Sequence, residues 1–186
     1  MKPKAFYYER PASLKEAGTL LNERELFAKA IAGSQSLGPM LNLRLAQPDL
    51  LVDVTGIPEM TSVLSERDFV SIGACITHAN IEDGRIEDPS RGLLAKVAGG
   101  IAYRAVRNRG TIGGSLAHAD PAAELPAVLL ALDGTVRVAG SNGERTIEAA
   151  DLFNGFLTTS LRHDEILVDL ELPVAPPRAG SAVVEV

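Results

Sequence analysis

Two short segments rich in glycine and hydroxyl side chains contain the residue types needed to bind a ligand through the main chain. The first loop is GSQS at 33–36, and the second loop is TIGGS at 111–115. Glycine lets the main chain approach a ligand closely, and the N–H groups of such a turn suit the oxygens of a diphosphate. The hydroxyl groups add donors without adding charge. A single loop of this kind is more often an ordinary turn. The hypothesis of a diphosphate site therefore requires that both loops bind the same diphosphate.

The polar residues that follow the second loop allow two interpretations. His118, Asp120 and Glu124 are spaced so that they could meet near a helix start, as metal ligands would. One histidine offers too little nitrogen ligation for zinc, and Asp120 before Pro121 is typical of a helix N-cap, so we expect no metal here. Glu124, one turn into that helix, is placed to accept hydrogen bonds from ribose hydroxyls; a solvated surface charge is the alternative.

The sequence favours binding over catalysis. It contains no GxSxG nucleophile elbow, no Walker A lysine and no legible Ser-His-Asp or Cys-His arrangement. Arg104, Arg107 and Arg109 precede the second loop and could contact a phosphate, although solvated or ion-paired arginines are at least as common.

Composition limits the class of protein. The 186 residues are 46% hydrophobic with a net charge of −6, enough to bury the core of one domain or two small ones. The absence of any Lys/Arg cluster argues against nucleic acid as a partner. No apolar segment is as long as a spanning helix and the N-terminus has no signal-peptide pattern, so we expect a cytoplasmic protein without membrane insertion. Cys75 lies in an apolar segment and is expected in the core.

Apolar spacing predicts the elements that hold the first loop. A helix is expected after Pro11, with Ser13 and Glu16 at capping-box spacing. A strand over 26–33, a helix over 36–46 and a second strand over 49–54 follow. The first loop therefore lies between a strand and a helix.

The second half predicts an antiparallel sheet with helices. Strands are expected over 69–77 and 165–173, the latter with one buried face, and a hairpin over 135–149 turns at 141–143. Thr77 can cap a short helix, and 90–106 looks largely helical despite two adjacent glycines. A further helix is expected to begin with Asp120 as its N-cap. The fold class is thus α+β.

Two longer segments carry a specific resemblance. AIAGSQSLGPMLNLRLAQPDLLVDV (30–54) and VRNRGTIGGSLAHADPAAELP (106–126), taken together, resemble the FAD-binding medium subunit of molybdenum hydroxylases, the carbon monoxide dehydrogenase and xanthine dehydrogenase group. The resemblance runs from about Phe6 to Pro173. It implies a two-lobed FAD-binding domain of the vanillyl-alcohol oxidase and p-cresol methylhydroxylase type, with a small α/β lobe, a larger lobe with an antiparallel sheet, and FAD between them.

The resemblance also implies the residues that bind FAD. Both loops would wrap the diphosphate, Glu124 would hold the adenosine ribose, and Leu167 would lie against the adenine. No catalytic residue is implied. The expected cofactor-binding residues are Ala32, Gly33, Ser34, Gln35, Ser36, Thr111, Ile112, Gly113, Gly114, Ser115, Glu124 and Leu167. The chain differs from the common family pattern in having serine at 34 and at 115.

Domain boundaries follow from the same resemblance. Residues 1–56 are expected to form the N-terminal α/β lobe, and residues 57–173 the second α+β lobe. Residues 174–186 would be a linker and the start of a C-terminal domain that family members have and this chain lacks.

The implied function is electron transfer within a larger enzyme. A molybdenum-cofactor large subunit would oxidise the substrate, a small subunit with 2Fe–2S clusters would pass the electrons on, and FAD on this chain would deliver them to an external acceptor. One alternative is a shortened assembly module with weak or no FAD binding. Another is a free-standing flavin oxidase, which would need a substrate pocket and acid–base residues near the flavin ring.

Overall fold

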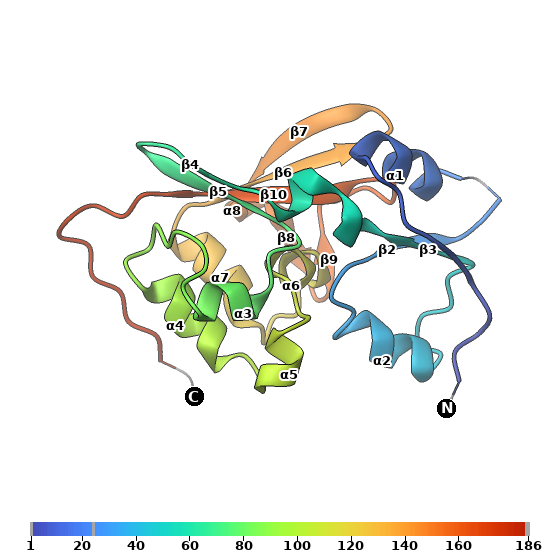
Figure 1. Cartoon of the computed structure of the whole chain (residues 1–186), viewed down its shortest axis with the longest axis horizontal. Helices are drawn as coiled ribbons and strands as arrows, with labels where there is room; N and C mark the ends of the chain where they lie inside the picture. Colours follow the sequence, from blue (N-terminus) through green and yellow to red (C-terminus); the bar gives the residue numbers. More distant parts are fainter. Residues whose placement is uncertain (1, 24, 185–186) are drawn as a thin grey trace.

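The N-terminal part of the chain forms a small parallel sheet. The computed structural model describes residues 2–23 and 25–184. The sheet has the strand order β1-β3-β2, with both outer strands parallel to β3. Figure 1 shows α1 on one side of this sheet and α2 on the other. The elements are β1 (Tyr7–Glu9), α1 (Leu14–Leu21), β2 (Ala28–Ile31), α2 (Leu37–Asn42) and β3 (Leu50–Asp53).

The capping box predicted for α1 is confirmed. The Ser13 hydroxyl accepts a hydrogen bond from the Glu16 N–H (3.3 Å), and the Glu16 carboxylate accepts one from the Ala12 N–H (3.0 Å). These bonds satisfy main-chain donors that the first turn of a helix leaves free. The helix then buries Ala17 and Leu21 in the main core.

The predicted helix over 36–46 is too long, because α2 ends at Asn42. Arg44 adopts a left-handed conformation with φ of 58°, which turns the chain away. Leu45, whose spacing suggested a longer helix, is 72% exposed, and Leu43 is 52% exposed. A short helix is stable only through packing, and these two side chains provide none.

The second sheet has five antiparallel strands in the order β4-β5-β10-β6-β7. Figure 1 shows α3 to α7 gathered on one side of it. Its strands are β4 (Val63–Ser65), β5 (Phe69–Gly73), β6 (Thr135–Gly140), β7 (Gly143–Glu148) and β10 (Ile166–Pro173). The helices are α3 (His78–Glu82), α4 (Leu93–Gly100), α5 (Arg104–Arg107), α6 (Ile112–His118), α7 (Glu124–Ala131) and α8 (Ala149–Leu152). Short 3-10 turns at Val54–Gly56 and Pro58–Thr61 and a small hairpin of β8 (Phe153–Gly155) and β9 (Thr158–Thr159) complete the described chain.

The strand predictions hold for the hairpin and need correction elsewhere. β6 and β7 are joined by a tight turn after Gly140, which pairs with Gly143. β5 ends at Gly73, so 74–77 lies outside the sheet. β10 is buried along nearly its whole length rather than on one face, because it is the central strand and both of its faces are covered.

The helix predictions for the second half also need correction. The segment 90–106 is two helices, α4 and α5, separated by Ala102 with φ of 43°. Asp120 is not an N-cap: its carboxylate accepts from the Ala122 N–H (2.9 Å) within a turn, and α7 begins at Glu124. That start places Pro126 in the first turn, where a missing N–H costs no helical hydrogen bond.

The helices of the described chain are short, and none of them is long and apolar enough to cross a membrane. Thr77 caps α3 as predicted, since its hydroxyl accepts from the Asn80 N–H. Cys75 is buried, as expected, and burial raises the pKa of its thiol to about 12.

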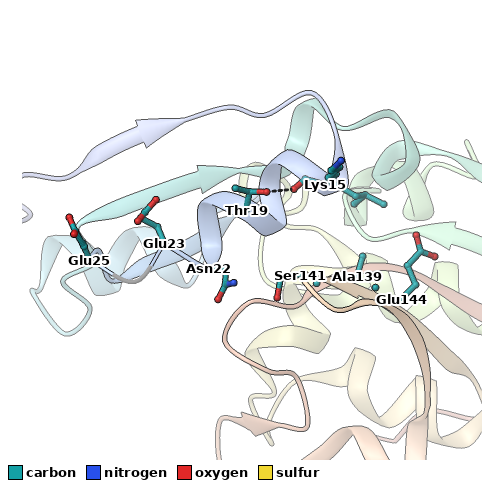
Figure 2. A pocket seen from close by; sticks show the side chains of 11 residues that line it. Lys15, Thr19, Asn22, Glu23, Glu25, Ala139, Ser141 and Glu144 are labelled. Carbon is teal, nitrogen blue, oxygen red and sulfur yellow. Dashed lines mark hydrogen bonds between the residues drawn. The ribbon is translucent and has the colours of Figure 1, made fainter.

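An open groove of about 690 Å³ separates α1 from the β6–β7 hairpin. Figure 2 shows Asn22 and Ser141 among the side chains that line it, with Glu23, Glu25 and Glu144 around them. Neither glycine-rich loop contributes to this groove. The groove is therefore separate from the site that the sequence predicts.

An ion pair ties the edge strand β7 to the start of β10. The Arg145 guanidinium donates two hydrogen bonds of 2.8 Å to the Glu165 carboxylate, which also accepts from the Arg162 N–H (2.7 Å). The Glu165 side chain is only 4% exposed. The bonds from Arg145 hold the pKa of Glu165 below its ordinary value, against the opposing effect of burial.

We expect Glu165→Gln to lower the free energy of unfolding at pH 7 by about 1–3 kcal/mol, the scale of hydrogen bonds to a charged group. Because the folded pKa lies below the unfolded value of about 4.3, the carboxylate stabilises the fold above that pH and loses this effect as the pH falls. Urea denaturation should therefore show the difference between variant and parent shrinking toward about pH 3. Glu148→Gln, at an exposed position of β7, is the control. A difference that stays constant with pH would contradict the assignment.

Candidate functional site

The two glycine-rich loops are brought into contact at Gly33. β2 ends at Ile31, and the chain then passes against residues 109–110, directly before the second loop. A Cβ at Gly33 would lie 1.9 Å from the Arg109 carbonyl oxygen and 2.9 Å from the Gly110 Cα. Side chains do not approach a main chain so closely, so only glycine fits at this position. The contact places the first loop against the residues that lead into the second loop.

The second loop is anchored to the segment that follows β5. Main-chain hydrogen bonds join residues 74–78 to residues 110–113 in a strand-like arrangement, with an isolated bridge between Thr77 and Thr111. A Cβ at Gly113 would lie 2.3 Å from the Ala74 Cβ, so this approach also requires glycine. Sequence reasoning missed the pairing, which has no local signal. The bonds run from His78 N to Gly110 O (2.9 Å), from Ile112 N to Ile76 O (3.0 Å) and from Gly113 N to Ala74 O (2.9 Å).

The two loops differ in the main-chain donors that they leave free. Across the described residues, the N–H groups from Gly33 to Leu37 have no protein acceptor. In the second loop only the Thr111 N–H lacks one, since the Gly114 N–H is held by the Thr111 hydroxyl (3.1 Å). The first loop therefore has most of the free main-chain N–H groups, whereas the main chain of the second loop is held by hydrogen bonds.

The shape of the first loop is set internally. The Gln35 side-chain amide donates to the Gly33 carbonyl (2.8 Å), and the Ser34 carbonyl accepts from the Gly38 N–H (2.9 Å). Ser34 adopts a left-handed φ of 60°, a conformation that favours glycine. Ser36 precedes α2 but makes no side-chain cap, so its exposed hydroxyl is available to a ligand. Ala32 is half-buried beside the core.

Residues of the second loop are mostly inaccessible. Ile112 is 1% exposed and belongs to the main core, and Gly113 is also buried. Thr111 is buried and caps α6, whereas Gly114 is exposed and Ser115 is half-buried. A ligand could therefore reach the main chain at Gly114 and the side chain of Ser115.

The other two predicted residues lie on neighbouring elements. Glu124 is the first residue of α7, which packs on α6, and its half-buried carboxylate makes no hydrogen bond or ion pair within the described chain. Leu167 in β10 is 4% exposed. The carbonyl of the next residue, Val168, accepts from the Ala74 N–H (2.8 Å) and so links β10 to the segment that anchors the second loop.

The histidine and carboxylates after the second loop do not form a metal centre. Over residues 2–23 and 25–184, no three histidine, cysteine or acidic side chains are grouped closely enough to hold a metal ion. Asp120 is occupied by its own turn.

The three arginines before the second loop have different environments. Arg104 binds Glu82 and Asp83 at 2.7 Å, and Arg107 binds Glu82 at 2.8 Å. The hydrogen bond from Arg107 lowers the pKa of Glu82, and that from Arg104 lowers the pKa of Asp83. These pairs fasten α5 to α3. Arg109 is exposed and makes no ion pair with any described carboxylate.

His78 lies behind the contact between the loops, a feature that sequence reasoning missed. A Cβ at Gly110 would lie 3.1 Å from the His78 Cε1, so Gly110 is enclosed between Gly33 and this ring. The ring is 5% exposed, and neither nitrogen has a partner within the described chain. Burial lowers the pKa of His78, which keeps the ring neutral at pH 7.

The free N–H groups of the first loop suit a ligand with acceptor oxygens, such as those of a phosphate. Residues 4–175 match the family described as the FAD binding domain in molybdopterin dehydrogenase. The chain belongs to this family. FAD is the cofactor of the family, which confirms the cofactor predicted from the sequence, and the resemblance to molybdenum hydroxylase subunits is likewise confirmed.

Two relatives of this chain are a medium subunit and a medium chain. The chain is 45% identical to the nicotine 6-hydroxylase medium subunit of Paenarthrobacter nicotinovorans over 95% of the chain and 62% of that protein. It is 38% identical to the carbon monoxide dehydrogenase medium chain of Hydrogenophaga pseudoflava over 98% of the chain and 63% of that protein. The chain thus spans less than two thirds of the length of these relatives.

Solved structures confirm the two-lobed α+β fold. Carbon monoxide dehydrogenase from H. pseudoflava superposes with a TM-score of 0.89 at 38% identity, over 95% of this chain and 62% of that one. Quinoline 2-oxidoreductase from Pseudomonas putida 86 gives a TM-score of 0.87 at 40% identity, over 94% and 61%. The fold predicted from the sequence is therefore the fold of this family.

We expect Ser34→Gly to raise the free energy of unfolding by about 0.5–1 kcal/mol. Glycine removes the clash that a Cβ makes in the left-handed conformation, which costs about 1–2 kcal/mol. This gain exceeds the free energy lost because glycine has more conformational entropy in the unfolded chain. Chemical denaturation would measure it, with Ser36→Gly as the control, because Ser36 has an ordinary φ of −101° and should lose stability. Loss of stability in Ser34→Gly would mean that the serine hydroxyl stabilises the turn before α2.

Proposed function

We propose that this chain holds FAD by its diphosphate across the two glycine-rich loops and serves as an electron-transfer subunit. The observation that carries the proposal is the contact of Gly33 with residues 109–110, beside a row of main-chain N–H groups without protein acceptors. Such donors match diphosphate oxygens, and the family match names FAD.

The residues take distinct parts in this proposal. Ala32, Gly33, Ser34, Gln35 and Ser36 surround the diphosphate from one side. Thr111, Ile112, Gly113, Gly114 and Ser115 close the other side, with the buried pair Ile112 and Gly113 acting as structural support. The unpaired Glu124 carboxylate accepts from the adenosine ribose, and Leu167 lies at the adenine end. The lobes proposed are 1–56 and 57–173, with 174–186 as a linker.

Chemistry in this proposal is limited to electron transfer. Bound FAD supplies the capacity to accept and release electrons, and the protein sets its position and surroundings. The proposed site residues are uncharged apart from Glu124, and none is arranged as a nucleophile with its base. A redox relay asks nothing more of them, whereas a free-standing oxidase would need acid–base groups at its substrate.

The relatives are named as medium subunits or medium chains of hydroxylases and dehydrogenases, which supports a place for this chain in a complex. We propose, from the family resemblance, that this chain receives electrons from iron–sulfur clusters of a small subunit, within a complex whose molybdenum-cofactor large subunit oxidises the substrate. The external acceptor receives them from FAD.

The direct test is FAD titration of the purified, cofactor-stripped chain, followed by flavin fluorescence. We expect saturable binding by the parent chain and a loss of affinity of about tenfold or more in Gly114→Asp, since the new carboxylate faces the diphosphate. Gly114 is exposed, and a Cβ there would meet only the Thr111 hydroxyl (2.7 Å). An acidic residue in the first turn of a helix is also favourable, so the variant should fold.

Gly180→Asp provides the matched control, because a Cβ at Gly180 has no neighbour within 4 Å and the net charge changes equally. It should bind FAD as the parent does. A parent chain that does not bind FAD would overturn the proposal and favour an assembly module. Equal binding by parent and Gly114→Asp would remove the second loop from the site.

A further inference from the structure

Of the three arginines before the second loop, Arg109 is the one whose side chain has no partner among the described residues. The guanidinium of Arg104 is bound by Glu82 and Asp83. The guanidinium of Arg107 is bound by Glu82 and by the carbonyl groups of 101 and 102. Removing either would free a carboxylate and loosen α5, so their role is structural.

The main chain of Arg109 is fixed, whereas its side chain is free. Its carbonyl oxygen abuts Gly33, and its N–H donates to the Val106 carbonyl (3.1 Å). The side chain is exposed and forms no ion pair or hydrogen bond within the described residues. Its main-chain position places this free guanidinium where the first loop meets the residues that lead into the second loop.

The donors around this junction are otherwise neutral. The first loop contributes main-chain N–H groups, and the second contributes the half-buried Ser115 hydroxyl. Neither loop contains lysine or arginine. A diphosphate carries negative charge on both phosphates, and a guanidinium can bind phosphate oxygens in a bidentate fork.

We propose that Arg109 is a positioning residue that binds the diphosphate of FAD and supplies the charge-dependent part of its affinity. The inference rests on the proposed function and adds a residue outside both loops. Neutral donors fix the geometry, and Arg109 adds an attraction that salt can screen.

The test is FAD titration of the parent chain, Arg109→Gln, Arg109→Lys and Arg67→Gln at ionic strengths of about 0.01 M and about 1 M. Arg67 is exposed in the turn between β4 and β5, so Arg67→Gln makes the same change in net charge away from the loops. We expect Arg109→Gln to bind about tenfold more weakly at low ionic strength and within about threefold of the parent at high ionic strength.

Arg109→Lys keeps the charge but not the fork, so its affinity should lie between those of the parent and Arg109→Gln. A purely structural role would weaken binding equally at both ionic strengths. The inference is overturned if Arg109→Gln binds like Arg67→Gln at low salt, or if its defect persists at high salt. Failure of the parent chain to bind FAD would instead refute the proposed function, and this inference with it.

Discussion

The structure depends on one close approach of main chain to main chain, where Gly33 meets the Arg109 carbonyl. The first loop leaves the small parallel sheet, and the second is paired with the segment that continues β5 of the large sheet. A single Cβ at residue 33 would overlap the Arg109 carbonyl, and the ring of His78 lies on the far side of Gly110. This approach therefore requires that residue 33 lack a side chain, and Gly110 leaves little room for one.

The anchoring of the second loop explains why the two loops differ in their free main-chain N–H groups. Two of its N–H groups, those of Ile112 and Gly113, donate to the carbonyls of Ile76 and Ala74. The helix before it, α5, is fastened to α3 by Glu82 and Asp83. Its main chain is consequently rigid. The first loop closes on itself through Gln35 and leaves a row of N–H groups unpaired. A site with one rigid wall and one preformed set of donors has little ordering left to do when a ligand binds.

Sequence patterns correctly predicted the structural features that depend on residues close together in the chain. The capping box at Ser13 and Glu16, the Thr77 cap and the hairpin turn after Gly140 involve residues close in sequence, and all three were predicted correctly. The end of α2 depends on the absence of packing for Leu43 and Leu45, and the burial of β10 depends on its central place in the sheet. The pairing of 74–78 with 110–113 joins segments that are distant in sequence, so no pattern within either segment indicates it. The glycine-rich loops were visible, but their contact was not.

The electrostatics of the site suit a relay. A ligand that binds two states of a system equally shifts nothing between them, however tightly it binds. Donors aimed at a diphosphate interact with a group whose charge is the same in oxidised and reduced FAD. His78 is neutral and Arg104 and Arg107 are balanced by carboxylates, so Arg109 is the unpaired charge where the loops meet, among the described residues. In the proposed site this charge also faces the diphosphate, so affinity for FAD would be obtained without biasing its redox equilibrium, and the surroundings of the ring would set the potential.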